Sequence, residues 1–244
     1  MSVHGGSIMA PPMVQESAAT TPRDVDAVCE FCGALAFVVG SYYFVVQALV
    51  DKWIPPYRVG SAWWVGGCVF NLVPPCRQLY RTWRYSAAIA SLSTSDSNTS
   101  GCCANHLRKT SVQYALLQVG GMLGYGIGCS LSFFPDCCIP LGPINILFCI
   151  GSACLVGDPA LQAARTWQTC SRVALAVLVS DFYAGFFFCL ASVFGGYASD
   201  TGIVAFGESC WGAGSLLGLV KPCTHFRARW LERAADSTSK NELV

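Results

Sequence analysis

The apolar residues of this chain gather in long runs that are separated by shorter polar segments. A run of about 20 predominantly apolar residues is long enough to cross the hydrocarbon core of a bilayer as an α-helix. The pattern therefore predicts an all-α integral membrane protein with six transmembrane helices. The predicted spans are residues 28–50, 59–79, 112–134, 142–163, 172–197 and 205–225.

A spaced motif recurs in every second run. It reads Phe or Trp, two residues, Gly, seven residues, Pro, two residues, Gln or His, four residues, Trp. Three ungapped copies indicate duplication of one unit. Because each unit holds two spans, all units keep one orientation, and we predict three tandem helical hairpins arranged as parallel repeats. The copies are Trp64, Gly67, Pro75, Gln78 and Trp83; Phe148, Gly151, Pro159, Gln162 and Trp167; and Trp211, Gly214, Pro222, His225 and Trp230.

The first run of each pair has a weaker pattern of its own. A polar residue stands seven positions before an aromatic residue, and a pair of small residues follows the aromatic one. Small residues allow helices to approach closely, which favours helix packing in lipid. We therefore expect the polar residues Glu30, Gln118 and Asp181 inside the membrane, with Phe37, Tyr125 and Phe188 as the matching aromatic residues.

The polar segments set the predicted boundaries. The first segment lacks the basic-then-apolar order of a cleaved signal peptide, so the first helix is expected to act as an uncleaved insertion signal. The Ser-rich segment between the first two hairpins predicts a flexible linker, and the last segment a disordered tail. The predicted units are a polar tail 1–26, hairpins 27–85, 111–168 and 169–232, the linker 86–110 and the polar tail 233–244.

Composition and charge agree with a membrane protein. Of the 244 residues, 53% are hydrophobic and 12% are charged, whereas a soluble domain has about 25% charged residues. All 15 Lys and Arg residues except Lys52 and Arg58 fall on the side shared by the two tails. The positive-inside rule therefore predicts that both termini are cytoplasmic. This distribution favours contact with lipid headgroups over nucleic acid.

The motif prolines are expected near the cytoplasmic ends of their helices. Proline removes a backbone donor and crowds the preceding turn, so a kink followed by an interfacial helix is predicted. Trp and basic residues are typical anchors at headgroup depth, and a headgroup- or anion-binding role is the alternative. The predicted interfacial set is Arg77, Arg81, Trp83, Arg165, Trp167, Lys221, His225, Arg229 and Trp230.

Two stretches resemble the YrhK-like small membrane domain family. They are residues 37–41, Phe-Val-Val-Gly-Ser, and residues 150–152, Ile-Gly-Ser, the latter followed by Pro159, Gln162 and Arg165. The resemblance extends over nearly all of residues 28–230 in three copies. It implies a small helical membrane domain and no particular reaction.

An unpaired carboxylate inside a span is expensive, so the acidic residues need partners. For Asp181 the expected partner is Lys221 or Arg172, and for Glu30 it is Arg77 or Arg81. These groups fit three roles, namely structural pairing, a proton or ion relay, and contact with a partner protein. Asp158 and Glu208 are expected at the interfaces.

Catalytic and metal-binding motifs are missing from the sequence. The histidines are His4, His106 and His225, and no H-E-x-x-H motif occurs. Most of the 15 cysteines lie in apolar runs, and paired C-x-x-C motifs of zinc-site spacing are absent. Cys102 and Cys103 beside His106 allow metal binding or palmitoylation as minor alternatives. We predict no enzyme activity, no metal and no cofactor.

Two functional hypotheses follow from the sequence. The first is a structural or accessory membrane component without its own catalysis, with the lipid bilayer and other membrane proteins as its partners. The second is a small channel, transporter or membrane sensor that uses the buried polar positions Asp181 and Glu30.

Overall fold

A computed structural model describes residues 22–50, 54–92, 101–131, 133, 141–197 and 201–241. Within these ranges every regular element is an α-helix, which confirms the prediction of an all-α protein. The helices are α1 (Pro22–Val50), α2 (Ile54–Leu92), α3 (Gly101–Leu131), α4 (Leu141–Thr166), α5 (Arg172–Tyr197), α6 (Thr201–Gly218) and α7 (Val220–Asn241).

Four helical segments in the described ranges are long and apolar enough to cross a membrane. The other two predicted spans lie in α2 and α3, which contain more polar and helix-disfavouring residues. Examples are Asn71 and Pro74 in α2 and Gln113 and Gln118 in α3. The structure thus supports a membrane protein, while the count of six spans stays a prediction. The four segments are Asp24–Val46, Pro143–Thr166, Arg172–Phe194 and Gly202–Ala234.

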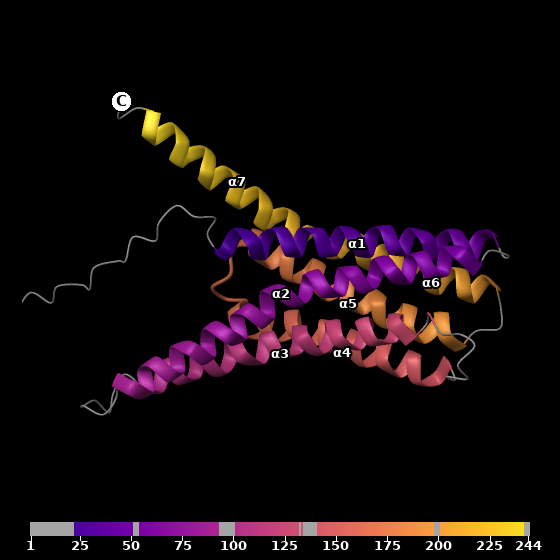
Figure 1. Ribbon diagram of the computed structural model, residues 1–244, viewed down its shortest axis with the longest axis horizontal. Helices are drawn as coiled ribbons and strands as arrows, with labels where there is room; N and C mark the ends of the chain where they lie inside the picture. Colours follow the sequence, from indigo (N-terminus) through magenta and orange to yellow (C-terminus); the bar gives the residue numbers. More distant parts are fainter. Residues whose placement is uncertain are drawn as a thin grey trace, which may run out of the picture.

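The contacts between the first six helices close into a ring. Each helix from α1 to α6 packs on its predecessor and its successor in the chain, and α1 packs on α6. Helix α7 follows α6 after the single residue Leu219 and contacts α1, α5 and α6. It leaves the ring at an angle, as Figure 1 shows. The ring turns one face of each of these six helices towards a shared axis.

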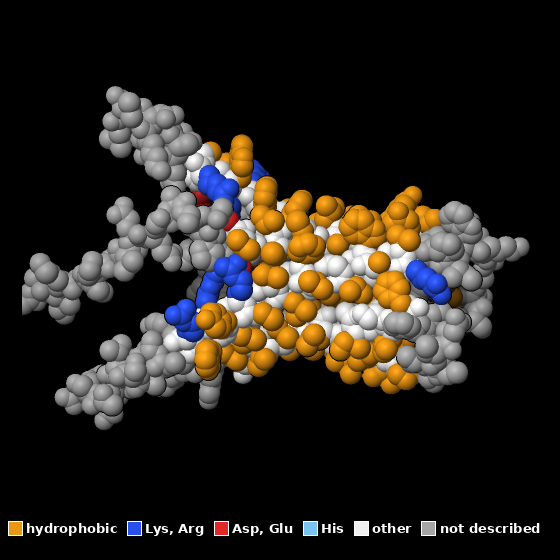
Figure 2. All heavy atoms as spheres, viewed as in Figure 1, with side chains coloured by type: hydrophobic (Ala, Val, Ile, Leu, Met, Phe, Trp, Pro, Cys, Tyr) orange, Lys and Arg blue, Asp and Glu red, His pale blue; other side chains and the backbone are white. Residues whose placement is uncertain are grey.

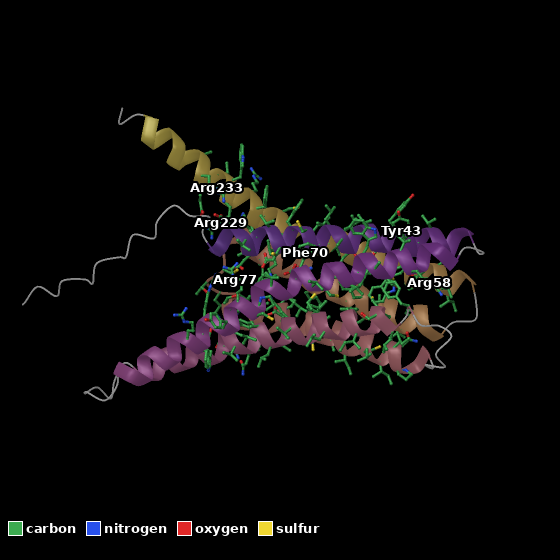
Figure 3. The ribbon with its side chains drawn as sticks, in the orientation of Figure 1. Tyr43, Arg58, Phe70, Arg77, Arg229 and Arg233 are labelled. Atoms are coloured by element: carbon green, nitrogen blue, oxygen red, sulfur yellow. The ribbon has the colours of Figure 1, made fainter. Side chains whose placement is uncertain are left out.

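The outside of the ring is apolar. Figure 2 shows hydrophobic side chains along the visible length of the bundle, with Lys and Arg side chains towards its ends. Arg77 and Arg229 lie near the end from which α7 leaves, and Arg58 lies near the opposite end (Figure 3). Soluble monomers rarely expose apolar patches beyond a few hundred Å², so this surface fits a lipid environment. Exposed residues include Leu35, Val69, Phe70, Leu116, Ile127, Ile150, Val179, Phe186 and Phe206.

The helices extend farther than the sequence indicated. Helix α2 continues past Pro74 and Pro75 to Leu92, and α3 begins at Gly101. The prediction of a flexible linker over 86–110 is therefore wrong for most of that segment, and residues 93–100 lie outside the described ranges. Residues 86–92 include three alanines and a leucine, and these strong helix formers continue the helix.

The end of the chain also differs from expectation. Helix α7 extends to Asn241, so the predicted disordered tail 233–244 is helical over most of its length. Similarly, α1 begins at Pro22, inside the predicted polar tail 1–26. Proline is well tolerated at the first helical position because its missing N–H would have no intrahelical partner there.

The motif glycines allow close contact between paired helices. Each one faces the aromatic residue that follows the polar position of the preceding helix. A Cβ atom added at any of the three would lie 3.2 Å or less from that aromatic ring. The contacts join α1 to α2, α3 to α4 and α5 to α6. They are Gly67 with Phe37, Gly151 with Tyr125, and Gly214 with Phe188.

Two adjacent glycines allow a matched test of this packing. In Gly67→Ala the new Cβ would lie 2.7 Å from two ring carbons of Phe37 and 3.0 Å from the carbonyl oxygen of Gly33. We expect the variant to lose about 1–3 kcal/mol of stability through overpacking. Gly66 has no atom within 4 Å of an added Cβ, so Gly66→Ala should be neutral or slightly stabilising. Denaturation in mixed micelles, followed by circular dichroism, compares the two variants. Equal stabilities would contradict the packing argument.

Candidate functional site: polar cavities along the bundle axis

An aromatic layer crosses the axis of the ring. Trp64 is 1% exposed and lies at its centre, and its ring centroid is 4.8 Å from those of Phe37 and Trp211. Its centroid is 5.5 Å from those of Tyr125 and Phe188. Each of the six ring helices contributes one residue to this layer. We define the aromatic layer as Phe37, Trp64, Tyr125, Phe148, Phe188 and Trp211.

Hydroxyl groups bond across helices at the same depth. The hydroxyl oxygens of Ser41 and Ser215 are 2.8 Å apart and join α1 to α6. Trp64 Nε1 donates to Ser41 Oγ at 3.3 Å. Ser152 Oγ lies 3.2 Å from Ser192 Oγ, and Ser152 also bonds to Tyr125. These bonds satisfy polar groups that would otherwise be unpaired among aromatic rings.

The first polar cavity lies between the aromatic layer and the end of the bundle where α1 begins and α7 leaves the ring. We call it the inner cavity. It has a volume of about 130 Å³. The three predicted intramembrane polar residues Glu30, Gln118 and Asp181 all line it, although they come from α1, α3 and α5. The motif prolines Pro75, Pro159 and Pro222 line it as well, with Asn71, Asp158 and Lys221.

The acidic residues of the inner cavity are paired, partly as expected. Lys221 Nζ lies 3.5 Å from Asp181 Oδ2, which confirms one of the two predicted partners of Asp181. Glu30 Oε2 instead lies 3.0 Å from His225 Nδ1. The prediction that Glu30 pairs with Arg77 or Arg81 is therefore wrong.

The two arginines have a different acidic partner. Arg77 Nη1 lies 3.0 Å from Asp26 Oδ1, and Arg81 Nη2 lies 3.4 Å from Asp26 Oδ2. Asp26 stands one helical turn before Glu30 on α1, towards the end where the arginines lie. Glu30 is left to His225 because α7 packs against α1, a contact that sequence spacing does not reveal.

Asp158 belongs to the inner cavity and not to the interface where the sequence placed it. It is 5% exposed. Its carboxylate accepts hydrogen bonds from Gln118 Nε2 and Gln162 Nε2, each at 2.8 Å. The sequence held a signal for this placement. Asp158 stands immediately before the motif proline Pro159, and Lys221 occupies the same position before Pro222. Residues before the motif prolines therefore face the axis.

A second, smaller cavity lies on the far side of the aromatic layer, and we call it the outer cavity. Its volume is about 50 Å³. Ser61, Asn145 and Glu208 line it, and each stands three residues before the motif aromatic of its helix. Asn145 was not among the residues predicted from the sequence, and Glu208 was expected at the interface. The shared spacing from the motif was the signal that could have found them.

The predicted anchor residues lie near the end where the inner cavity is found. Trp83, Trp167 and Trp230 are about two-thirds exposed, with 65–67% of their surface accessible. Arg165 Nη2 donates to Gln113 Oε1 at 3.0 Å. The positions suit interfacial anchors, whereas Lys221 faces the inner cavity and His225 contacts Glu30.

Metal-binding arrangements are not found among the described residues. No group of three or more His, Cys, Asp or Glu side chains there is placed to hold a metal ion. The cysteines whose side chains are described are free thiols. Cys102, Cys103 and His106 lie outside the described side chains, so their predicted alternatives stay predictions.

Comparison of the chain with models of known families, with curated proteins and with solved structures finds no match. The distinctive feature of the chain is its geometry, with two polar cavities and the aromatic layer between them.

Proposed function

We propose that the chain crosses the membrane six times as three tandem hairpins. Support comes from the ring order of the helices and from the matching glycine–aromatic contact in each hairpin. The less apolar helices α2 and α3 also expose apolar side chains, including Val69, Phe70, Leu116 and Leu123. Such residues fit lipid-facing positions. The likeness to the YrhK-like family is part of this proposal, as are cytoplasmic termini.

We further propose that the protein is a structural or accessory membrane component without its own catalysis. The observation behind this proposal is that several polar side chains of the interior bond to one another across helices. His225 joins α7 to Glu30 of α1, and Ser152 joins α4 to Ser192 of α5. In a bilayer, such bonds between helices stabilise association because lipid offers no polar alternative.

The aromatic layer fills the axis of the bundle, and this favours the accessory function over an open pore. Trp64, at the centre of the aromatic layer, is almost fully buried. An open aqueous pore needs a continuous path of polar groups or water, and the ring packing interrupts it here. The described interior is therefore organised for packing, with polar cavities on either side.

The accessory function predicts stable association with other membrane proteins. Extraction from the native membrane in mild detergent, followed by native mass measurement, should give a defined assembly much larger than the 26.1 kDa chain. Its composition should include unrelated membrane proteins. A lone monomer or a small homo-oligomer would contradict this function. A non-native membrane protein of similar size, extracted in parallel, controls for co-solubilised micelles.

A small transporter or sensor is the second candidate, and the inner cavity favours it. The cavity holds three carboxylates, Glu30, Asp158 and Asp181, but one ammonium group, Lys221. This imbalance favours positively charged or proton-donating solutes. A cavity of about 130 Å³ has room for a few water molecules or a small ion, since one water needs about 10–15 Å³ on this measure.

Flux measurements test the transport function directly. Liposomes that contain the purified chain should pass protons or small cations, and Asp181→Asn or Glu30→Gln should abolish the flux because each removes a charge from the inner cavity. Arg229→Gln changes a charge that is paired with the exposed Glu232 and does not line the inner cavity, so it should leave the flux intact. Absence of flux above protein-free liposomes would exclude transport of the cations tested.

A further inference from the structure

The outer cavity is a separate site from the inner cavity. On α5, Asp181 lines the inner cavity and Ser192 lines the outer cavity. Helix α4 runs in the opposite direction, so its earlier residue Asn145 lines the outer cavity and its later residue Asp158 lines the inner cavity. Asp158 stands 13 positions after Asn145, which corresponds to about 20 Å along a helix. The aromatic layer fills the space between the two cavities.

Two polar atoms in the outer cavity lack a partner within the protein. Asn145 is 6% exposed, and its Nδ2 atom has no hydrogen-bond partner. The Oε2 atom of Glu208 is also buried without one. Leaving such groups unpaired is costly, most of all for a carboxylate. No Lys, Arg or His is among the residues that line this cavity, so no side chain there supplies a counter-charge.

The remaining walls favour a cation. The rings of Phe44, Trp64, Phe148 and Trp211 line the cavity, and aromatic faces attract positive charge. Ser61 and Ser192 add hydroxyl groups, whose oxygens have lone pairs for a cation or its water. A single carboxylate balances a single positive charge. The volume of about 50 Å³ suits a small ion with a water molecule and is far below the roughly 300 Å³ of the smallest ligand pockets.

We propose that the outer cavity binds one small monovalent cation, such as ammonium, Na⁺ or K⁺. Glu208 is its counter-charge, and Asn145 Nδ2 donates to the water that accompanies the ion. Trp64 and Trp211 line the cavity beside the ion. The site is independent of the proposed accessory function, since a structural ion and a transported ion would both occupy it.

Cation-dependent stability tests the site. The purified full chain in lipid nanodiscs is unfolded by heat at increasing ammonium, Na⁺ or K⁺ chloride, with N-methyl-D-glucamine chloride holding the ionic strength constant. Ligands that bind the folded state raise Tm with their concentration. We expect a saturable rise of several degrees for at least one of the three ions. Equal Tm values in all four salts would overturn the proposal.

Matched variants assign the effect to this cavity. Glu208→Gln keeps the side-chain shape but removes the charge, so its Tm should no longer respond to the ion. Asp181→Asn changes the inner cavity and should keep the response. The reverse result, a response lost in Asp181→Asn and kept in Glu208→Gln, would overturn the proposal.

A second readout, tryptophan fluorescence, tests the site in the native chain and so does not depend on the folding of a variant. Trp64 and Trp211 line the cavity, so ion binding should change the intrinsic fluorescence of the native chain over the same concentration range as Tm. Asn145→Leu should shift that range to at least several-fold higher ion concentration. An unchanged midpoint in Asn145→Leu would contradict the assignment to this cavity.

Discussion

Trp64→Ala should be among the most destabilising single substitutions in this chain. Its side chain is 1% exposed and contacts aromatic rings from several helices of the bundle, among them Phe37, Tyr125, Phe188 and Trp211. Truncation removes these contacts and leaves a cavity at the centre of the ring. It also removes the donor to Ser41 Oγ.

The expected loss is about 2–4 kcal/mol. Buried Trp→Ala substitutions in soluble proteins cost about 3–5 kcal/mol. In a bilayer the transfer part of that cost is smaller, because separated helices also lie in an apolar medium. The packing and cavity parts remain. Equilibrium unfolding in mixed micelles, followed by circular dichroism, measures the difference.

Trp63→Ala is the matched control. Trp63 is the adjacent residue of the same helix but is 45% exposed on the outer surface. Its side chain does not belong to the aromatic layer, so its loss should cost much less than the loss of Trp64. Similar losses for the two variants would show that the aromatic layer does not hold the ring together.

Lys221→Met should give the second large effect. The Lys221 ammonium lies 3.5 Å from Asp181 Oδ2, and the two side chains are 25% and 19% exposed. Methionine keeps much of the length of lysine but leaves the Asp181 carboxylate in the inner cavity without its cation. Removing one partner of a buried pair costs about 3–5 kcal/mol. Because this pair is partly exposed, we expect a loss near the lower limit.

The double variant Lys221→Met/Asp181→Leu separates pairing from general disruption. Replacing a whole buried pair with apolar residues is often neutral, so the second change should restore part of the lost stability. Restoration should be incomplete, because Glu30 and Asp158 line the same cavity and also lose a nearby positive charge. Additive losses in the double variant would contradict the pairing.

Arg229→Met is the control on the same helix. Arg229 lies 2.7 Å from Glu232, one turn away, and the Glu232 side chain is 63% exposed. Exposed pairs of this kind contribute about 0–1 kcal/mol. Thermal unfolding of the two single variants in the same nanodiscs should therefore separate them clearly. Equal losses would indicate that any charge change on α7 is destabilising.

The sequence by itself determined the helical character of the chain and some of the positions that line its interior, among them Glu30, Gln118 and Asp181. The length of each apolar run is read directly from the order of residues, so long apolar helices were predictable. The spacing from Glu30 to Phe37 and from Trp64 to Gly67 marks residues on the same helical faces, because these intervals are close to whole turns. Lys221 was also predicted as one of two possible partners of Asp181, since both were expected near the same membrane face.

Only the tertiary structure decided which helices meet. Glu30 pairs with His225 because α7 packs on α1, at a sequence separation of 195 residues. Asp158 and Glu208 were expected at the interfaces, but ring closure turns both towards the axis. Local spacing gives the face of a helix on which a residue lies. Which neighbour covers that face depends on the packing of all six ring helices, and hence so do the two cavities.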